Sequence, residues 1–234
     1  LHLVEIVARM AAGEVPHRDF TTPLGVLAFL PARAFAWAGL GTAILAGQIL
    51  VAAALVPAIW WAAVSRMPGG LGYLFGLIVI VAVTAIGYGD SGAGLSVSMF
   101  YNRWAWGIAF VVVAVAVLPP VAARSGVADG AVIGLGLAFL ALMKITFFVA
   151  LAVPVAVALL LRENWRALLT ALAAGAGVAV AAGLAWGADF LLNYLDDLRF
   201  VAGSGVRPQP TNSGLAVLTG ADFILPNLLL LMSA

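Results

Sequence analysis

Cysteine and charged residues are what this sequence lacks most. The 234-residue chain contains no cysteine, which excludes a disulfide framework, a thiolate metal site and a thiol nucleophile. Only 9% of its residues are charged, whereas a soluble globular domain carries about 25%. So little charge cannot cover a water-facing surface, and we therefore exclude an ordinary soluble enzyme and a disordered segment.

The charges that are present almost cancel, because 11 basic residues stand against 10 acidic ones and give a net charge of +1. This balance supplies no basic patch, and we therefore expect no nucleic-acid partner. Hydrophobic residues make up 65% of the chain. Since backbone groups in lipid must be hydrogen-bonded within the structure, the long apolar runs predict an all-α fold, a polytopic transmembrane helical bundle in contact with membrane lipid.

Several uncharged runs reach the length of about 20 mostly apolar residues that a membrane-spanning helix needs. The run at residues 215–234 is interrupted by Asp222 and Pro226, and we interpret it as a truncated transmembrane helix. No signal-peptide pattern opens the chain, which begins at Leu1 and ends within an apolar run, so we expect an internal piece of a longer protein. The uninterrupted candidate spans are Leu40–Val64, Gly70–Gly87, Trp104–Ala123 and Ala167–Ala188.

Residues 131–161 form a longer apolar stretch, with Lys144 as its single charged residue. One straight helix of this length would run about 46 Å, well beyond the hydrocarbon core of ~30 Å. Two shorter helices that turn near Lys144–Thr146 avoid this mismatch. Such a hairpin brings Lys144 to a membrane face instead of leaving it at the midplane.

The distribution of arginine favours the hairpin. It places the segments 65–69, 124–130 and 162–166 on one side of the membrane, and these 17 residues hold four arginines, whereas the other side holds six in 81 residues. Short arginine-rich loops stay in the cytoplasm. We therefore expect residues 1–234 to form one multi-pass transmembrane domain, with its helices in 40–188. The long segments expected outside are 1–39, 88–103 and 189–214.

The first 39 residues are rich in local signals. In Leu1–Ala12 apolar residues recur at helical spacing opposite a polar stripe, which predicts an amphipathic helix that Gly13 ends in a left-handed conformation. Two prolines and two glycines in Gly13–Gly25 predict an ordered non-helical loop. We interpret Leu24–Trp37 as a second helix. Both helices are expected to lie on the membrane surface, in the first extracytoplasmic loop.

The run Arg9–Pro31 (RMAAGEVPHRDFTTPLGVLAFLP) resembles the first extracytoplasmic loop of GT-C superfamily glycosyltransferases. In that loop a short helix is followed by Gly-x-x-Pro-(Tyr/His)-x-Asp and then by a proline step into a second surface helix. The run Gly134–Leu161 (GLGLAFLALMKITFFVALAVPVAVALLL) is similar to the Gly-Leu-x-x-Leu-x-Lys-x-(Thr/Gly) hairpin of the same superfamily.

The resemblance implies a membrane glycosyltransferase of the cell envelope, which we expect in the bacterial inner (cytoplasmic) membrane. Such enzymes transfer a hexosyl or pentosyl group from a polyprenyl-phosphate sugar donor to a glycan, lipid or protein acceptor on the extracytoplasmic face. An acidic residue acts as base on the acceptor hydroxyl, and we identify Asp19 and Glu5 as the catalytic candidates. The acid usually assigned as base would stand upstream of Leu1, so we expect the chain to lack the first transmembrane helix and the C-terminal part of such an enzyme.

Basic and polar residues of the outer segments are the substrate-binding candidates, because cations and amides suit phosphate and sugar groups. Lys144, the only lysine, would neutralise a lipid phosphate; the alternative is a lysine that marks the interface. For Asp19 the alternative is a cap on a turn through Thr21 and Thr22, with Arg18 as its partner. The full set of binding candidates is His17, Arg18, Lys144, Asn102, Arg103, Arg199 and Arg207.

A divalent metal ion is the one cofactor that we consider. His2 and Glu5 belong to residue types that coordinate such an ion, but the pattern supplies no third ligand, so we assign no metal site. The pair Asp196-Asp197 is more typical of a solvated helix face, because adjacent helical residues point about 100° apart.

Two other function classes remain. A transporter or flippase-like permease for a lipid-linked substrate would place polar groups at mid-membrane, often in repeated halves. The spans here are nearly free of charge and no internal repeat is evident, which favours chemistry at the outer face. A non-catalytic scaffold would not need the His, Asp, Asn and Arg residues of the outer segments.

Overall fold

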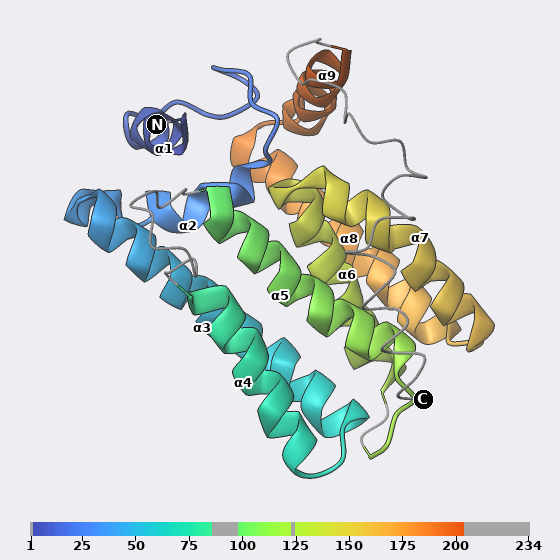
Figure 1. The fold of residues 1–234 in the computed structure, drawn as a ribbon. Helices are drawn as coiled ribbons and strands as arrows, with labels where there is room; N and C mark the ends of the chain where they lie inside the picture. The colour runs from blue at the N-terminus through green and yellow to red at the C-terminus, as the bar shows by residue number, and fades with distance from the viewer. Residues whose placement is uncertain (1, 86–97, 123–124, 204–234) are drawn as a thin grey trace, which may run out of the picture. The chain divides into compact units, whose positions relative to one another are not determined.

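The structure is a computed structural model and describes residues 2–85, 98–122 and 125–203. Within these ranges the chain is helical and contains no β-strand. Figure 1 shows the helices in chain order. They are α1 His2–Ala11, η1 Val26–Ala28, α2 Leu30–Arg33, η2 Ala36–Ala38, α3 Leu40–Arg66, α4 Gly70–Thr84, α5 Ser98–Val117, α6 Gly126–Met143, α7 Ile145–Leu161, α8 Trp165–Trp186 and α9 Phe190–Gly203.

Four of the described helices are long and apolar enough to cross a membrane, namely α3, the part Phe100–Val117 of α5, α6 and α8. The apolar helices α4 and α7 are shorter, with 15 and 17 residues. Large apolar side chains stand on the outside of these helices; Leu184 of α8, for example, is 84% exposed. This arrangement is that of a multi-pass membrane-associated protein. The expected span at 215–234 lies outside the described residues.

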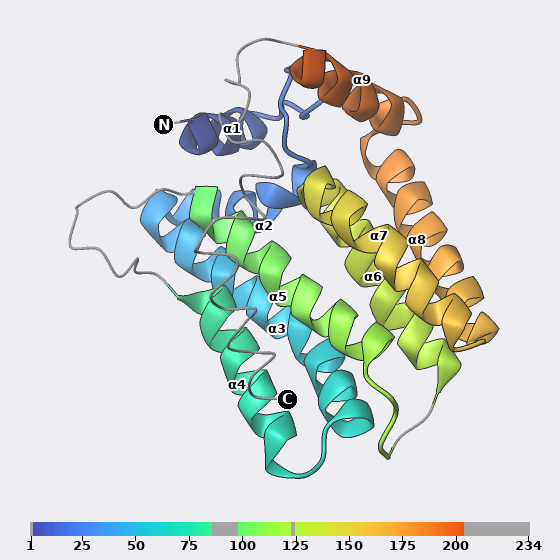
Figure 2. The ribbon, with the colours of Figure 1, turned by 45° about the vertical axis from the view of Figure 1, so that its right-hand side comes forward.

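The chain divides into two compact units, Leu1–Asp197 and Leu198–Ala234. In the first unit α3, α4 and α5 pack side by side, and so do α6, α7 and α8 (Figures 1 and 2). Helix α5 joins the two groups because it contacts α3 and α4 on one side and α6 and α7 on the other.

Glycines bring α6 and α8 together. A Cβ atom at Gly134 would overlap the backbone of Ala171, and one at Gly130 would overlap the backbone of Ala167. This close approach is the role expected of small residues in membrane helices. The same expectation fails for Gly175 and Gly177, because nothing in the described chain lies within 4 Å of a Cβ built at either position.

The apolar stretch 131–161 is broken at Lys144, as the length argument predicts. Lys144 has an extended backbone (φ −154°, ψ 99°), so α6 ends before it and α7 begins after it. The far ends of the two helices also meet, because Asp129 near the start of α6 and Arg162 at the end of α7 line one pocket. The stretch is therefore a helical hairpin.

The N-terminal segment agrees with the sequence in part. Helix α1 buries Ile6, Val7 and Met10, and Gly13 follows with the predicted left-handed backbone (φ 97°). The single helix expected over Leu24–Trp37 is wrong. Pro31 stands in the first turn of the four-residue α2, and only the short helices η1 and η2 flank it, so the stretch is divided into three short helices.

Candidate functional site

Arg9 organises the N-terminal loop. Its Nε donates to Oε2 of Glu14 at 2.7 Å, and its guanidinium lies 4.2 Å from the centre of the Phe20 ring. A further nitrogen, Nη2, donates to the backbone carbonyl of Asp19 at 3.4 Å. Arg9 thus contacts Glu14 near the start of the loop and Asp19 and Phe20 further along it, which fixes the positions of the residues between them.

Asp19 has its oxygens engaged inside this loop. Its Oδ2 accepts from the backbone N–H of Val15 at 2.7 Å, and Arg18 donates to both carboxylate oxygens, at 3.2 and 3.1 Å. The hydrogen bonds from Arg18 and then from Val15 lower the pKa of Asp19, so the carboxylate is ionised at neutral pH. This geometry matches the turn-capping alternative, with Val15 in place of the threonines that we expected.

His17 points the opposite way, into the protein. Its backbone is left-handed (φ 66°), its side chain is fully buried, and its ring lies 4.6 Å from that of Tyr194 in α9. Burial lowers the pKa of His17, against the opposing effect of Asp197. The imidazole is therefore neutral at pH 7, and since a carboxylate only accepts, Nδ1 donates to Oδ2 of Asp197 at 2.8 Å.

Asp197, which the sequence analysis interpreted as a solvated residue, and Tyr194, which it did not single out, are the neighbours of His17. Oδ2 of Asp197 also accepts from the backbone N–H of Thr22 at 3.1 Å, so one carboxylate oxygen holds the loop at two points. The hydroxyl of Tyr194 donates to the Ala141 carbonyl at 2.8 Å, and burial raises its pKa to about 12. The spacing of Phe190, Tyr194 and Asp197 at i, i+4 and i+7 is the signal that could have placed them on one helix face.

Lys144 and Asn102, two predicted binding residues, are in contact. The Lys144 Nζ donates to Oδ1 of Asn102 at 2.7 Å. The same ammonium lies 5.8 Å from the Tyr101 ring centre and 5.5 Å from that of Phe147. The half-buried lysine at the α6–α7 break is thus held by an amide and two aromatic rings of α5 and α7.

The N-terminal loop reaches the same break. The Gly25 N–H donates to the Met143 carbonyl at 3.2 Å, and a Cβ at Gly25 would overlap the backbone of Leu142. Together with the bond from Tyr194 to Ala141, this contact ties the His17 network to the end of α6. The loop, the Lys144–Asn102 pair and the start of α9 therefore lie at one end of the bundle. We call this end the lysine end.

The other predicted residues are not gathered there by any contact of the described chain. Glu5 is exposed on α1 and bonds to no residue that the structure describes. Arg103 donates to the Ala85 carbonyl and lines a cavity of about 410 Å³ with Trp106 and Phe110. Arg199 is exposed on α9, in the second unit, and Arg207 lies outside the described residues.

The arrangement places the Lys144 ammonium beside the Asn102 amide, with the ionised Asp19 carboxylate and the exposed Glu5 side chain on the N-terminal segment. In the ranges 2–85, 98–122 and 125–203 no group of three or more His, Asp or Glu side chains could hold a metal ion. Comparison of the whole chain with protein-family models, with curated proteins and with solved structures gives no match.

Proposed function

We propose that the chain is part of an integral membrane glycosyltransferase. It would transfer a sugar from a polyprenyl-phosphate donor to a glycan, lipid or protein acceptor on the extracytoplasmic face of the bacterial inner membrane. The observation that carries the proposal is the contact between Lys144 and Asn102 at the lysine end. The sequence resemblance to GT-C glycosyltransferases supplies the reaction class.

The proposed membrane orientation follows from the arginines. Arg66, Arg162 and Arg166 lie in or beside the short turns at the end opposite Lys144. Short arginine-rich turns face the cytoplasm, which directs the lysine end outward. In this orientation α1 lies along the outer surface, with Ile6 and Val7 packed inward and Glu5 toward solvent.

Lys144 is proposed to bind the donor phosphate. A half-buried ammonium attracts a phosphate more strongly than one in bulk water, because the local dielectric constant is lower. Oδ1 of Asn102 accepts from the ammonium and orients it. Arg103, the next residue of the same helix, donates to the Ala85 carbonyl and is not assigned to this phosphate site.

The transfer step needs a base for the acceptor hydroxyl. The hydroxyl oxygen attacks the anomeric carbon while its proton passes to a carboxylate, and the bond from that carbon to the phosphate oxygen breaks, so that polyprenyl phosphate leaves. Asp19 already accepts three hydrogen bonds within the loop. Glu5 is exposed and has no bond to the described chain, so of the two it is the carboxylate more open to a hydroxyl.

His17 takes a different role from the one expected of it. Its side chain is fully buried and bonded to Asp197, so it would act as a positioning residue that holds the loop and would not touch the sugar. Arg18 is 54% exposed and paired with Asp19, and this pair is the part of the loop that an acceptor could contact.

The test is a transfer assay with purified full-length protein in proteoliposomes. The vesicles contain a labelled polyprenyl-phosphate sugar and a membrane extract as acceptor, with and without a chelator for divalent metal ions. Transfer should fall at least tenfold in Lys144→Ala and Glu5→Gln and should stay unchanged in Arg166→Gln, whose charge lies at the other end. Absence of transfer by the unaltered protein, or equal rates in all variants, would overturn the assignment.

A permease for a lipid-linked substrate is the second candidate, and one observation favours it. Gln48 is 2% exposed within α3, and neither Nε2 nor Oε1 has a partner in the described chain. Polar groups inside membrane helices often mark a substrate path. Movement of the labelled lipid across the vesicle without sugar transfer, abolished by Gln48→Leu, would select this function.

A further inference from the structure

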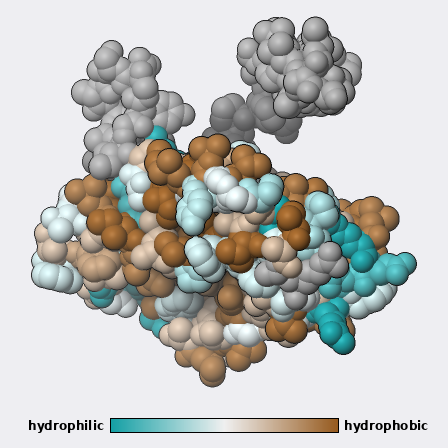
Figure 3. Space-filling view, turned by 90° about the horizontal axis from the view of Figure 1, so that it is seen from below, coloured by the Kyte–Doolittle hydropathy of each residue, from teal (hydrophilic) through white to brown (hydrophobic). Residues whose placement is uncertain are grey.

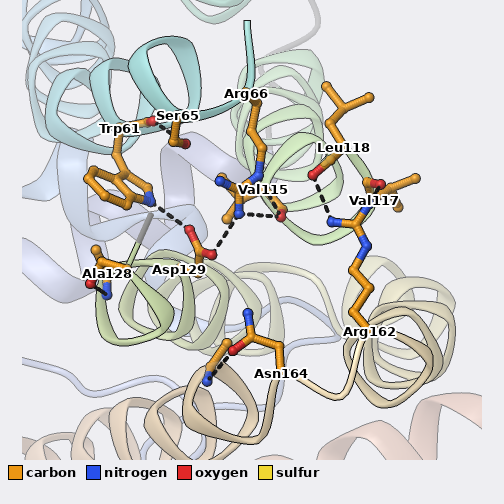
Figure 4. Close-up of polar contacts among 12 residues, drawn as sticks. Trp61, Ser65, Arg66, Val115, Val117, Leu118, Ala128, Asp129, Arg162 and Asn164 are labelled. Atoms are coloured by element: carbon orange, nitrogen blue, oxygen red, sulfur yellow. Dashed lines mark hydrogen bonds and ion pairs between the residues drawn. The ribbon is translucent and has the colours of Figure 1, made fainter. Parts of the chain in front are cut away.

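A polar pocket lies at the end of the bundle opposite Lys144, and it plays no part in the proposed sugar transfer. Its volume is about 450 Å³. It lies where the end of α3, the end of α5, the start of α6 and the turn between α7 and α8 meet (Figure 4). Its polar lining consists of Arg66, Asp129, Arg162, Glu163 and Asn164.

Arg66 is the buried cation of this pocket, with a side chain only 2% exposed. Its Nη2 donates to Oδ2 of Asp129 at 2.6 Å, and its Nε and Nη2 donate to the Val115 carbonyl at 3.2 and 3.1 Å. The third nitrogen, Nη1, is buried and has no partner in the described chain. A buried guanidinium nitrogen without an acceptor is destabilising, so an acceptor from outside the chain would stabilise the fold.

Asp129 leaves one donor of Arg66 unused. Its Oδ1 accepts from Nε1 of Trp61 at 2.8 Å while its Oδ2 accepts from Nη2 of Arg66, so the buried ion pair is neutral as a whole. Arg162 and Glu163 are both exposed, and water screens their charges alike. The feature that favours an anion is therefore the buried Nη1 of Arg66, which has no partner in the described chain.

Arg162 brings a second guanidinium to the same pocket. Its Nη1 donates to the Leu118 carbonyl at 2.7 Å and its Nη2 to that of Val117, which fixes the cation at the last carbonyls of α5 (Figure 4). Asn164 starts α8 beside it and accepts from the Ala167 N–H. Seen on this end of the molecule in Figure 3, hydrophilic side chains gather on the side of the α7–α8 turn, next to a largely apolar surface.

We propose that this pocket binds the phosphate group of an anionic membrane lipid. The unpartnered Nη1 of Arg66 is a donor for one phosphate oxygen, and Arg162 supplies a second cation in the same lining, because charge-assisted N–H bonds to phosphate are strong. A lipid is favoured over soluble phosphate since the pocket opens among apolar helices, where acyl chains would continue along the outer faces of α7 and α8. Basic pockets between membrane helices on the cytoplasmic side bind anionic headgroups in this way.

The experiment measures binding to the full-length protein in detergent by native mass spectrometry and by titration. Three probes are compared: dihexanoyl phosphatidylglycerol, dihexanoyl phosphatidylcholine and inorganic phosphate. Arg162→Gln removes one guanidinium, and Arg66→Lys keeps a cation for Asp129 while removing Nη1. Arg166→Gln is the control, because it removes a positive charge at the same end from a residue that does not line the pocket.

We expect one phosphatidylglycerol per chain, bound at least ten times more tightly than the other two probes. Each lining variant should weaken it about tenfold, the loss expected for one charge-assisted hydrogen bond, while Arg166→Gln should change it less than twofold. Thermal unfolding of each variant shows whether it is folded. Three results would overturn the proposal: equal binding of inorganic phosphate, equal loss in Arg166→Gln, or binding that both lining variants leave unchanged.

Discussion

His17 donates through Nδ1 to Oδ2 of Asp197 at 2.8 Å, a contact that joins residues 180 positions apart. The same oxygen accepts from the Thr22 N–H, so Asp197 fastens both ends of one turn of the N-terminal loop to α9. This contact connects the loop that carries Asp19 to the rest of the lysine end.

Replacing Asp197 should therefore loosen the loop. In Asp197→Ala the buried His17 Nδ1 and the Thr22 N–H both lose their acceptor, which we expect to lower the free energy of unfolding by about 1–3 kcal/mol. Asp189→Ala is the matched control, because that side chain is exposed just before the start of the same helix. Thermal unfolding followed by tryptophan fluorescence measures both, and an equal loss in the two variants would contradict the role of Asp197.

The buried His17 predicts a dependence of stability on pH. Burial lowers its pKa in the folded state below the ordinary value of 6.5, so the unfolded chain binds the proton more readily. The contribution of His17 is therefore complete above pH 6.5 and is lost as the pH falls from 6.5 toward the folded-state pKa. The unfolding temperature of the unaltered protein should be lower at pH 5.5 than at pH 7.5, and this difference should be smaller in His17→Gln.

The control for this pH series is the other histidine of the chain, His2. His2→Gln should keep the same loss of stability between pH 7.5 and 5.5 as the unaltered protein. A pH dependence that survives in His17→Gln would assign the proton to another group.

Glycines that face a neighbouring helix and glycines that face none in the described chain should respond differently to replacement by alanine. Gly134→Ala places a methyl group against the backbone of Ala171, and overpacking of this kind costs about 1–3 kcal/mol. Gly177→Ala meets nothing within 4 Å in the described chain and should leave the unfolding temperature unchanged or raise it slightly. If Gly177→Ala lowered the unfolding temperature more than Gly134→Ala, the close α6–α8 contact at Gly134 would be contradicted.

The pair of Arg66 and Asp129 should stabilise the fold only as a pair. Asp129→Asn leaves a buried guanidinium without its counter-charge, and breaking a buried ion pair in this way costs about 3–5 kcal/mol. Asp189→Asn changes the same residue type at an exposed position and should cost little. Chemical or thermal unfolding in detergent compares the two, and a stable Asp129→Asn protein would show that the ion pair contributes little.

Much of the helical layout follows from hydropathy and length. The break at Lys144 is predictable because a straight helix over the 31 residues 131–161 would be longer than the hydrocarbon core is thick. The observed ends of α3 and α8 lie close to the ends of the predicted spans. Hydropathy cannot show that Leu24–Trp37 is divided into short helices, however, because proline is accepted in the first turn of a helix and disrupts a helix only further along.

The candidate site is less predictable, because its contacts join distant segments. The residue types of Lys144, Asn102 and His17 mark them as candidates, but nothing local shows that the first two touch each other while the third turns inward. Asp197 reads as a solvated residue until Thr22 and His17 are placed beside it. Likewise, glycine spacing does not tell which face of a helix meets a neighbour, which separates Gly134 from Gly177.

Binding of a polyprenyl phosphate at Lys144 is the most direct test of the proposed function. Farnesyl phosphate serves as the probe, titrated against the purified full-length protein, against Lys144→Ala and Lys144→Arg, and against Arg166→Gln as the control of equal charge loss. We expect Lys144→Ala to weaken binding of farnesyl phosphate about tenfold or more, Lys144→Arg to keep a large part of the affinity, and Arg166→Gln to leave the affinity unchanged. Equal affinity in the unaltered protein and in Lys144→Ala would contradict phosphate binding at Lys144.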